Sequence, residues 1–372
     1  MSIKTARAEG LPLPHIHVRP MLAEEKKVTS AVMRRALSPL QQLFFSWKGH
    51  TLVAEREGQI LGATMLNTFP FSGGRKGGIV LWIFTDPAVQ GQGAGQALAE
   101  AAIAFFDAEG CTDTFACVEG YNTSSSKLWA TRGFGILSPG TQFRRYGLGV
   151  LPMWWNTFHF IDLGHFLWTR PPADQSDSPA LQWWGTLAMN AILIWLALWQ
   201  HRGFREFHPL YLLMVPLWLL LFLGARTLAM LAVAKAQGIA LRYRAWESGF
   251  PLGIVIALAF GGFYPSPGNF YPTTEHWRYR EWLPKLGPVA LAGLLPGLIL
   301  SWGLWALGRF GNLGAGIQMW CNIGMMIGVS LSIFDAFLAF FPFVSFNARR
   351  VWDWKRWMWG LLALVTVALV MI

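Results

Sequence analysis

Three glycines at alternating positions, Gly91, Gly93 and Gly95, lie in the stretch QGQGAG, directly before a sequence with helical periodicity. Glycine lets the backbone approach an anion closely, and the first amides of a helix have no intrahelical partners and carry partial positive charge. Such a turn can therefore hold a phosphate group. It is not a Walker A loop, because no Lys-Ser or Lys-Thr follows Gly95. It is not the dinucleotide pattern either, because Leu98 stands at the third glycine position. A plain tight turn is the alternative.

The surrounding sequence predicts the elements that position this turn. Residues 77–87 have the pattern of a buried strand, and residues 94–110 that of a helix that ends at Gly110. Residues 50–67 alternate with period two on both sides of a glycine turn, which predicts a hairpin. A further strand is expected at 112–120 and a short helix at 123–134. Residues 1–150 are therefore predicted to form one α/β domain.

Two motifs in this domain resemble the GNAT family of N-acetyltransferases. They are Gln90-x-x-Gly93-x-Gly95 after a strand, and VEGYNTSSSKLWATRGF at residues 118–134. The resemblance implies a mixed, mostly antiparallel sheet with flanking helices. It implies acetyl-CoA as substrate, with its pyrophosphate on the amides of residues 91–96 and its pantetheine arm between strands that end near Asp86 and Glu119. The cofactor-binding residues that follow from it are Phe84, Thr85, Gln90, Gly91, Gln92, Gly93, Ala94, Gly95, Gln96, Asn122 and Ser125.

The same resemblance implies direct acetyl transfer to an amine, which must lose a proton before it attacks. The family takes an oxyanion-stabilising amide from the strand before the turn, here around Phe84 and Thr85. A Tyr in the pattern L-Y-x-x-x-G-F usually protonates the leaving thiolate, but here Trp129 occupies that position. An indole N–H is not a usable acid.

Other side chains are needed for proton transfer. We expect Glu119 as the base, with Glu55 and Asp86 as further candidates, and Tyr121 as the acid, with a serine of 124–126 as the alternative. The segments that would select the acceptor, 69–78 and 21–37, carry no substrate motif, so the acceptor amine is not predicted.

The composition indicates a membrane protein. Hydrophobic residues make up 53% of the chain and charged residues 13%, against about 25% charged in an ordinary soluble domain. The net charge is +10, but the basic residues after position 200 fall between apolar runs, which favours lipid headgroups over nucleic acid as the partner. Cys111, Cys117 and Cys321 are scattered and have neither zinc nor disulfide spacing.

Apolar runs long enough to cross about 30 Å of hydrocarbon follow a linker at 170–180. They lie at about 181–200, 209–234, 286–308, 316–343 and 356–372, and a shorter run at 249–267 is broken by glycines and prolines. Residues 181–372 are therefore predicted to form a polytopic membrane domain. Residues 151–180 are expected to be an aromatic interfacial segment and linker, in which His159, Asp162 and His165 form a polar rim.

The membrane half resembles, in its framing residues, the site-2 protease family of intramembrane zinc proteases. Arg226, Thr227 and Met230 occupy the positions of the family's His, Glu and second His, and Asn347 that of its ligand Asp. Gly287-Pro288 matches the family's Gly-Pro. Zinc requires neutral imidazoles and carboxylates, so the resemblance implies an inactive protease and no metal. An unrelated bundle of apolar helices is the alternative.

The distribution of basic residues predicts the topology. With the N-terminal domain cytoplasmic and six crossings, four basic residues lie inside (235, 242, 244, 309) and nine outside (202, 205, 278, 280, 285, 349, 350, 355, 356). With a re-entrant 249–267, the count becomes ten inside and three outside, as the positive-inside rule requires. We therefore expect five spans, a re-entrant segment and an outside C-terminus. Arg226 and Asp335 lie within predicted spans and are expected to pair.

Two functions remain open from the sequence. The first is a multi-pass cell-membrane protein that transfers an acetyl group from acetyl-CoA to an amine at the cytoplasmic face, on a membrane protein or a lipid-derived amine. The second is a non-catalytic acetyl-CoA sensor coupled to the inactive protease-like bundle. Release of free thiol in the presence of an amine would distinguish them.

Overall fold

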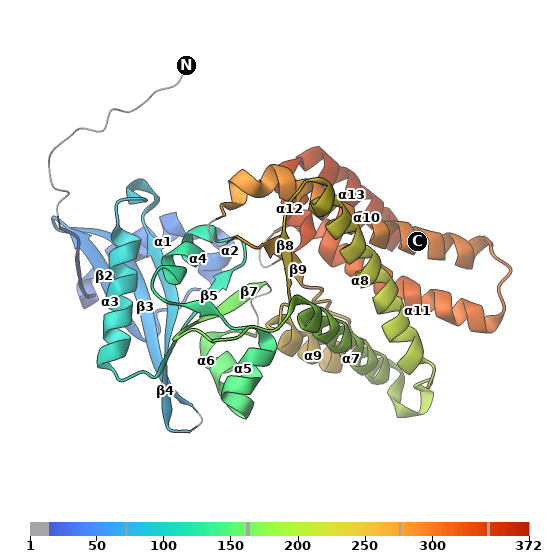
Figure 1. Cartoon of the computed structure of the whole chain (residues 1–372), viewed down its shortest axis with the longest axis horizontal. Coiled ribbons are helices and arrows are strands. Elements are labelled where there is room, and N and C mark those ends of the chain that lie inside the picture. Colours follow the sequence, from blue (N-terminus) through green and yellow to red (C-terminus); the bar gives the residue numbers. More distant parts are fainter. Residues whose placement is uncertain (1–14, 72, 161–163, 275–276, 341–342, 372) are drawn as a thin grey trace, which may run out of the picture. The chain divides into compact units, whose positions relative to one another are not determined.

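The computed structural model describes residues 15–371, except 72, 161–163, 275–276 and 341–342. Its contacts divide the chain into two compact units (Figure 1). One unit comprises the residues up to Phe69 together with Lys76–Thr114, and the other comprises Pro70–Arg75 and the chain from Phe115 onward. The second unit therefore contains the later strands of the α/β region as well as the apolar helices.

Seven strands form one sheet in the order β1-β2-β3-β4-β5-β7-β6. The β1/β2, β2/β3 and β6/β7 pairs are antiparallel. The strands are β1 (His17–Pro20), β2 (His50–Arg56), β3 (Gln59–Phe71), β4 (Arg75–Thr85), β5 (Asp113–Glu119), β6 (Gly135–Ile136) and β7 (His165–Arg170). The expected hairpin at 50–67 is confirmed. Its turn residues Glu57 and Gly58 have φ of 53° and 77°, the left-handed conformation that a tight two-residue turn requires.

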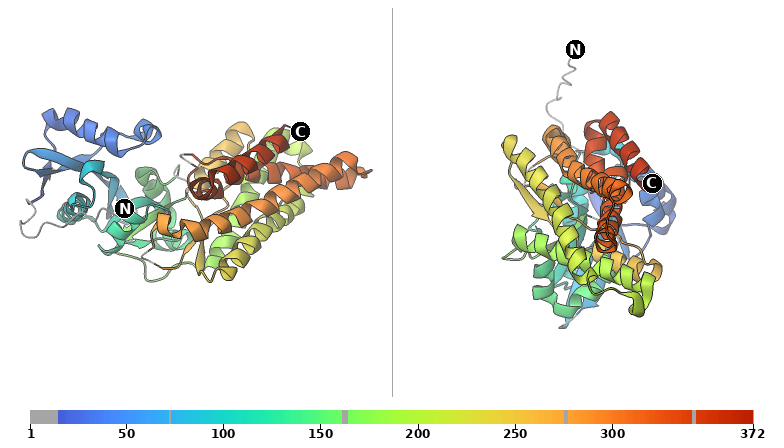
Figure 2. Two further views of the ribbon diagram at one scale, coloured as in Figure 1. Left: turned by 90° about the horizontal axis from the view of Figure 1, so that it is seen from above. Right: turned by 90° about the vertical axis from the view of Figure 1, so that its right-hand side faces the viewer.

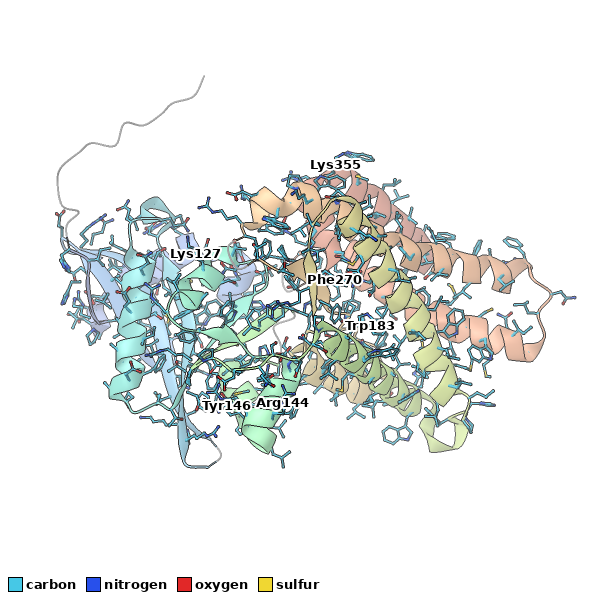
Figure 3. The ribbon with its side chains drawn as sticks, in the orientation of Figure 1. Lys127, Arg144, Tyr146, Trp183, Phe270 and Lys355 are labelled. Atoms are coloured by element: carbon cyan, nitrogen blue, oxygen red, sulfur yellow. The ribbon has the colours of Figure 1, made fainter. Side chains whose placement is uncertain are left out.

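Six helices accompany these strands: α1 (Lys26–Ala36), α2 (Pro39–Phe44), α3 (Ala94–Ala108), α4 (Thr123–Ala130), α5 (Pro139–Tyr146) and α6 (Val150–Thr157). In the first unit, α3 buries Leu98, Ala102 and Phe106 completely. In the second unit, α5 carries Arg144 and Tyr146 (Figure 3), and Arg144 forms an ion pair of 2.8 Å with Asp177.

The sheet extends past residue 150. Residues 165–170, expected within an interfacial segment, form β7, whose Trp168 and Thr169 are opposite Ile136 and Gly135 of β6. The expected polar rim is corrected as well. His159 is fully buried and His165 lies on β7, while Asp162 falls outside the described residues. Trp154, Phe166 and Trp168 of this segment are buried in a folded unit, whereas Trp155 and Phe158 are exposed. Composition alone does not distinguish the buried aromatic residues from those of an interface.

The helical region is built from α7 (Pro179–Glu206), α8 (Tyr211–Ala236), β8 (Leu241–Arg244), α9 (Gly249–Phe260), β9 (Asn269–Pro272), α10 (Tyr279–Phe310), α11 (Ala315–Ser332), α12 (Asn347–Trp354) and α13 (Arg356–Val370). A π-helical turn, Ile333–Phe337, continues α11. Helices α7, α8, α10 and α11 run alongside one another (Figure 2) and enclose a core that includes Ile194, Met214, Leu219 and Ile327.

Four helices are long and apolar enough to cross a membrane: Pro179–His201, Tyr211–Ala236, Tyr279–Phe310 and Ala315–Phe337. Gly249–Phe260 and Arg356–Val370 are shorter apolar helices. Large apolar side chains such as Leu228, Ile299 and Leu364 are each more than 65% exposed. Water would disfavour such a surface, whereas lipid tails would solvate it.

Candidate functional site

The glycine turn leads into α3 through a left-handed backbone. Gly91 and Gly93 have φ of 81° and 95°, and Gly93 is the N-cap of α3 and provides no side-chain cap. The space in front of Gly93 is open, because a Cβ there would meet only the Ile16 Cδ1 atom at 3.8 Å. The start of α3 therefore has no side-chain cap from Gly93 and has open space in front of that glycine, as phosphate binding requires.

The end of β4 supports this turn. Phe84 is buried in the core of the first unit. A Cβ atom added to Gly62 would lie 3.0 Å from the Thr85 Cγ2 atom, and one added to Gly95 would lie 3.8 Å from it. Gln92 accepts a 2.7 Å hydrogen bond from the Arg56 guanidinium. The predicted residues 84–96 therefore form one continuous strand–turn–helix unit.

Two of the candidate bases are held in ion pairs. Asp86 accepts hydrogen bonds from the Arg35 guanidinium at 2.5 Å and 3.0 Å and from the Ala88 amide at 3.0 Å. These contacts lower the pKa of Asp86, with Arg35 the larger cause. Glu55 accepts from the Arg19 guanidinium at 2.8 Å and 2.5 Å. A carboxylate whose charged form is stabilised in this way is a poorer proton acceptor, which makes Asp86 a weaker candidate for the base.

The second motif forms the start of α4. Asn122 is the N-cap residue, and its Oδ1 atom accepts a 3.1 Å hydrogen bond from the Ser125 amide. Asn122 is exposed and Ser125 is partly exposed. Trp129, at the position of the family's tyrosine, is 1% exposed, and its ring centroid lies 4.9 Å from that of Phe134. The indole is therefore a core residue of this unit.

Tyr121, the predicted acid, lies in a buried polar network. Its hydroxyl donates to the Ser345 carbonyl at 3.0 Å and accepts hydrogen bonds from the Arg350 and Asn269 side chains. Its ring stacks on that of Tyr279, with centroids 5.0 Å apart. Burial raises the pKa of Tyr121 well above its usual value despite the opposing effect of Arg350. The phenol is therefore engaged by the helical region, which favours a positioning role over proton transfer.

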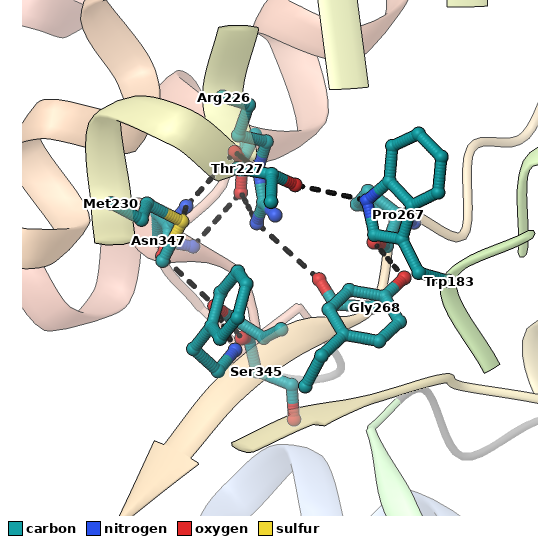
Figure 4. A network of polar contacts seen from close by, with 12 residues as sticks. Trp183, Arg226, Thr227, Met230, Pro267, Gly268, Ser345 and Asn347 are labelled. Carbon is teal, nitrogen blue, oxygen red and sulfur yellow. Dashed lines mark hydrogen bonds and ion pairs between the residues drawn. The ribbon is translucent and has the colours of Figure 1, made fainter. Parts of the chain in front are cut away.

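Arg226 and Asp335 pair within the helical region, as predicted. Arg226 Nε donates to Asp335 Oδ2 at 2.8 Å. The Nη2 atom of Arg226 donates to the Gly268 carbonyl at 3.3 Å (Figure 4). The Asn347 amide and side chain donate to the two carboxylate oxygens at 3.0 Å and 3.1 Å. Met230 approaches Asn347 at 3.9 Å. A cavity of about 20 Å³ beside Arg226, Ser332 and Asp335 is large enough for one water molecule.

This cluster does not fit a zinc ion. A guanidinium, an amide and a thioether occupy three of the four positions that the protease family would use, and the neighbouring carboxylate is already bonded on both oxygens. Within the described part of the chain, no group of three or more His, Cys, Asp or Glu side chains could hold a metal ion.

One side chain connects this cluster to Tyr121. The Asn269 side-chain amide donates to Asn347 Oδ1 at 3.2 Å, to the Ser345 carbonyl at 3.1 Å and to the Tyr121 hydroxyl at 3.3 Å. A buried hydrogen-bonded path therefore runs from Asp335 to the residue before Asn122. Sequence reasoning missed Asn269 and Arg350, because their contacts join positions far apart in the chain.

Comparison with known proteins agrees with the resemblance to the GNAT family. It agrees more distantly with the resemblance of the membrane half to a zinc protease. The sequence model of the acetyltransferase (GNAT) family matches residues 19–134. "Putative zinc metalloprotease MJ0611" of Methanocaldococcus jannaschii is 28% identical over 134 residues, which are 36% of this chain and 65% of that protein. The match therefore spans less than two thirds of that relative's length.

Several solved structures are similar to part of the chain. N-acetylglutamate synthase from Neisseria gonorrhoeae, complexed with coenzyme A and N-acetyl-glutamate, is 18% identical and covers 43% of this chain and 35% of its own, with a TM-score of 0.32. The ribosomal-protein-S18-alanine N-acetyltransferase of Escherichia coli is 13% identical, covers 42% and 92%, and has a TM-score of 0.30. An acetyltransferase of Bacillus subtilis in complex with CoA is 15% identical, covers 33% and 79%, and has a TM-score of 0.29.

The family match covers the strand–turn–helix unit and the start of α4, where the two motifs lie. Residues 19–134 are therefore a GNAT acetyltransferase domain, joined in one chain to a helical region with four candidate membrane spans.

Proposed function

We propose that the protein is a membrane-tethered N-acetyltransferase that transfers an acetyl group from acetyl-CoA to an amine at the cytoplasmic membrane face. The observation that carries the proposal is the start of α3, which follows left-handed Gly91 and Gly93 and has no side-chain cap, within a GNAT domain. The amides of residues 91–96 would bind the pyrophosphate, and Asn122 and Ser125 would contact the cofactor. When bound, acetyl-CoA supplies the activated acetyl group.

The protein's own residues then handle the proton and the developing charge. Glu119 accepts the proton of the acceptor amine, and backbone amides around Phe84 and Thr85 stabilise negative charge on the carbonyl oxygen. Tyr121 holds the start of α4 in place through its bonds to Ser345 and Asn269. The tether confines the reaction to amines near the membrane.

Replacing Gly93 with aspartate tests whether the glycine turn binds the pyrophosphate. The variant places a carboxylate beside the phosphate and a side chain at a φ of 95°. Like-charge contacts cost several kcal/mol, so acetyl-CoA should bind at least about 100-fold more weakly in calorimetric titration of the full chain in detergent. The matched control is Gly110→Asp, because Gly110 also has positive φ and open surroundings but lies beyond the other end of α3.

Absence of binding to well-folded wild-type protein would contradict the proposal and leave the glycines as a simple turn.

With binding established, a panel of amines is monitored for release of free thiol. The second candidate, a non-catalytic sensor, predicts binding without thiol release. It is favoured by the buried path from Tyr121 to Asp335 and by the burial of Trp129.

We also propose that the segment containing α9 is re-entrant. Arg244 of β8 pairs with Asn269 of β9, so the chain returns after α9 to the point from which it left. Irregular backbone at membrane depth is tolerated where protein surrounds it. This supports the topology with ten basic residues inside and three outside.

Single cysteines at two exposed positions test this topology. With α9 re-entrant, Thr274→Cys should be protected from a membrane-impermeant thiol reagent in intact cells, and Gly314→Cys should be labelled. Six crossings predict the reverse pattern. The unmodified chain, with its three native cysteines, provides the background.

A further inference from the structure

A cysteine, a histidine and a glutamate form a line within the second unit, apart from the residues assigned above. Cys117 lies on β5, His159 just after α6, and Glu247 between β8 and α9. The Cys117 Sγ atom is 3.7 Å from His159 Nδ1, and His159 Nε2 is 2.9 Å from Glu247 Oε1. The two ring nitrogens therefore face a sulfur on one side and a carboxylate on the other.

The imidazole and the carboxylate are enclosed, whereas the cysteine is partly exposed. His159 has no exposed surface and Glu247 is 2% exposed. Glu247 also accepts a 2.5 Å hydrogen bond from Gln142, whose carbonyl accepts a 2.6 Å bond from the Trp154 indole. The carboxylate is thereby fixed from two directions, and it fixes the orientation of the ring. The Cys117 thiol also donates a 3.6 Å hydrogen bond to the Thr157 carbonyl.

The charges in this line favour a protonated ring. Burial alone disfavours the imidazolium, but Cys117 and Glu247 outweigh it and raise the pKa of His159 to about 10. Both nitrogens of an imidazolium are donors. The Nδ1 donor therefore points at the cysteine sulfur.

A nucleophile beside a base that a third group orients is the arrangement of cysteine and serine acyl-transfer sites. We propose that Cys117 is a second reactive centre, a nucleophilic thiol that accepts an acetyl group from a thioester. This inference rests on the proposed function, because acetyl-CoA is the thioester that the domain would hold. Cys117 and Glu119 lie two residues apart on β5 and so project from the same face of the strand.

The step balances without another reactant. The Cys117 sulfur, its proton on His159, attacks the thioester carbonyl and forms a new carbon–sulfur bond. The bond to the original sulfur breaks, and the leaving thiolate takes the proton from His159. One thioester is exchanged for another, so no oxidant or energy source is needed.

The first test compares Cys117 with Cys111 in the same protein. Cys111 is also partly exposed, but the charged groups that act on it are Lys76 and acidic side chains such as Glu109 instead of a histidine, and burial raises its pKa. Limited alkylation of the full chain in detergent at neutral pH, followed by peptide mass mapping, should modify Cys117 at least about tenfold faster than Cys111. Glu247→Gln should slow Cys117 and leave Cys111 unchanged. Equal rates at the two cysteines in wild-type protein would overturn the proposal, whether or not any variant folds.

The second test adds acetyl-CoA and maps hydroxylamine-sensitive acetyl groups. Acetylation of Cys117 in wild type, and its absence from Cys117→Ser, is the expected result. Fast alkylation without acetylation, in protein that binds acetyl-CoA, would overturn the thioester assignment and leave the acetyltransferase proposal intact. Failure to bind acetyl-CoA at all would reject the proposed function, independently of the alkylation rates.

Discussion

Replacing Asp335 with leucine is expected to lower the free energy of unfolding by about 3–5 kcal/mol, because the change leaves the Arg226 guanidinium buried without its counter-charge. Both side chains of the pair are less than 10% exposed, and Asp335 also accepts two bonds from Asn347. Thermal unfolding in detergent, followed by circular dichroism, should show a midpoint lowered by several degrees. Arg226→Met should have a similar effect for the complementary reason.

The double variant Arg226→Met, Asp335→Leu should recover part of that loss, because neither charge then remains buried alone. Recovery should be incomplete, since Asn347 still loses two acceptors. Glu281→Ala is the control, because Glu281 pairs with Arg278 on the exposed start of α10 and should leave the midpoint unchanged. An unaltered midpoint in both single variants would show that the pair does not stabilise the bundle.

Trp129→Ala should destabilise the protein by about 3–5 kcal/mol, as expected for removal of a fully buried Trp side chain. The indole is among the largest completely buried side chains, and the Phe134 amide bonds to the Trp129 carbonyl at 3.2 Å. Lys127→Ala on the same helix removes an exposed side chain (Figure 3) and should change little. Chemical unfolding, followed by tryptophan-independent far-ultraviolet dichroism, compares the two.

Trp129→Tyr separates packing from catalysis. If this position only fills the core, the tyrosine variant should be less stable than wild type and release thiol no faster. A faster release of thiol from acetyl-CoA in the presence of an amine would instead show that the side chain reaches the reacting groups. In that case Trp129 would occupy a position from which a tyrosine can protonate the leaving thiolate.

The parts of the fold that depend on neighbouring residues followed from the sequence. The strand–turn–helix of residues 77–110 is encoded locally by apolar periodicity and by glycines at positive φ. The Arg226–Asp335 pair could be predicted because an isolated charge within a span is so costly that the only acid in a span had to be its partner.

Features that depend on distant contacts could not be found in this way. Strand β7 has an aromatic composition that also suits a membrane interface, and its place in the sheet between β5 and β6 distinguishes the two. His159 had no visible partner because Glu247 is 88 positions away. The Tyr121 contacts with Ser345 and Arg350 span 224 and 229 positions, beyond any pattern of spacing.

Those separations affect the order of events during synthesis. Tyr121 leaves the ribosome long before Ser345 and Arg350, which are 224 and 229 residues later. At about 5–20 residues per second the delay is about 10–45 s, during which the phenol lacks its partners. The four candidate membrane helices, α7, α8, α10 and α11, are also synthesised in that interval. A chain stalled or truncated before residue 345 would therefore lack the bonds of Tyr121 to Ser345 and Arg350 that hold the start of α4.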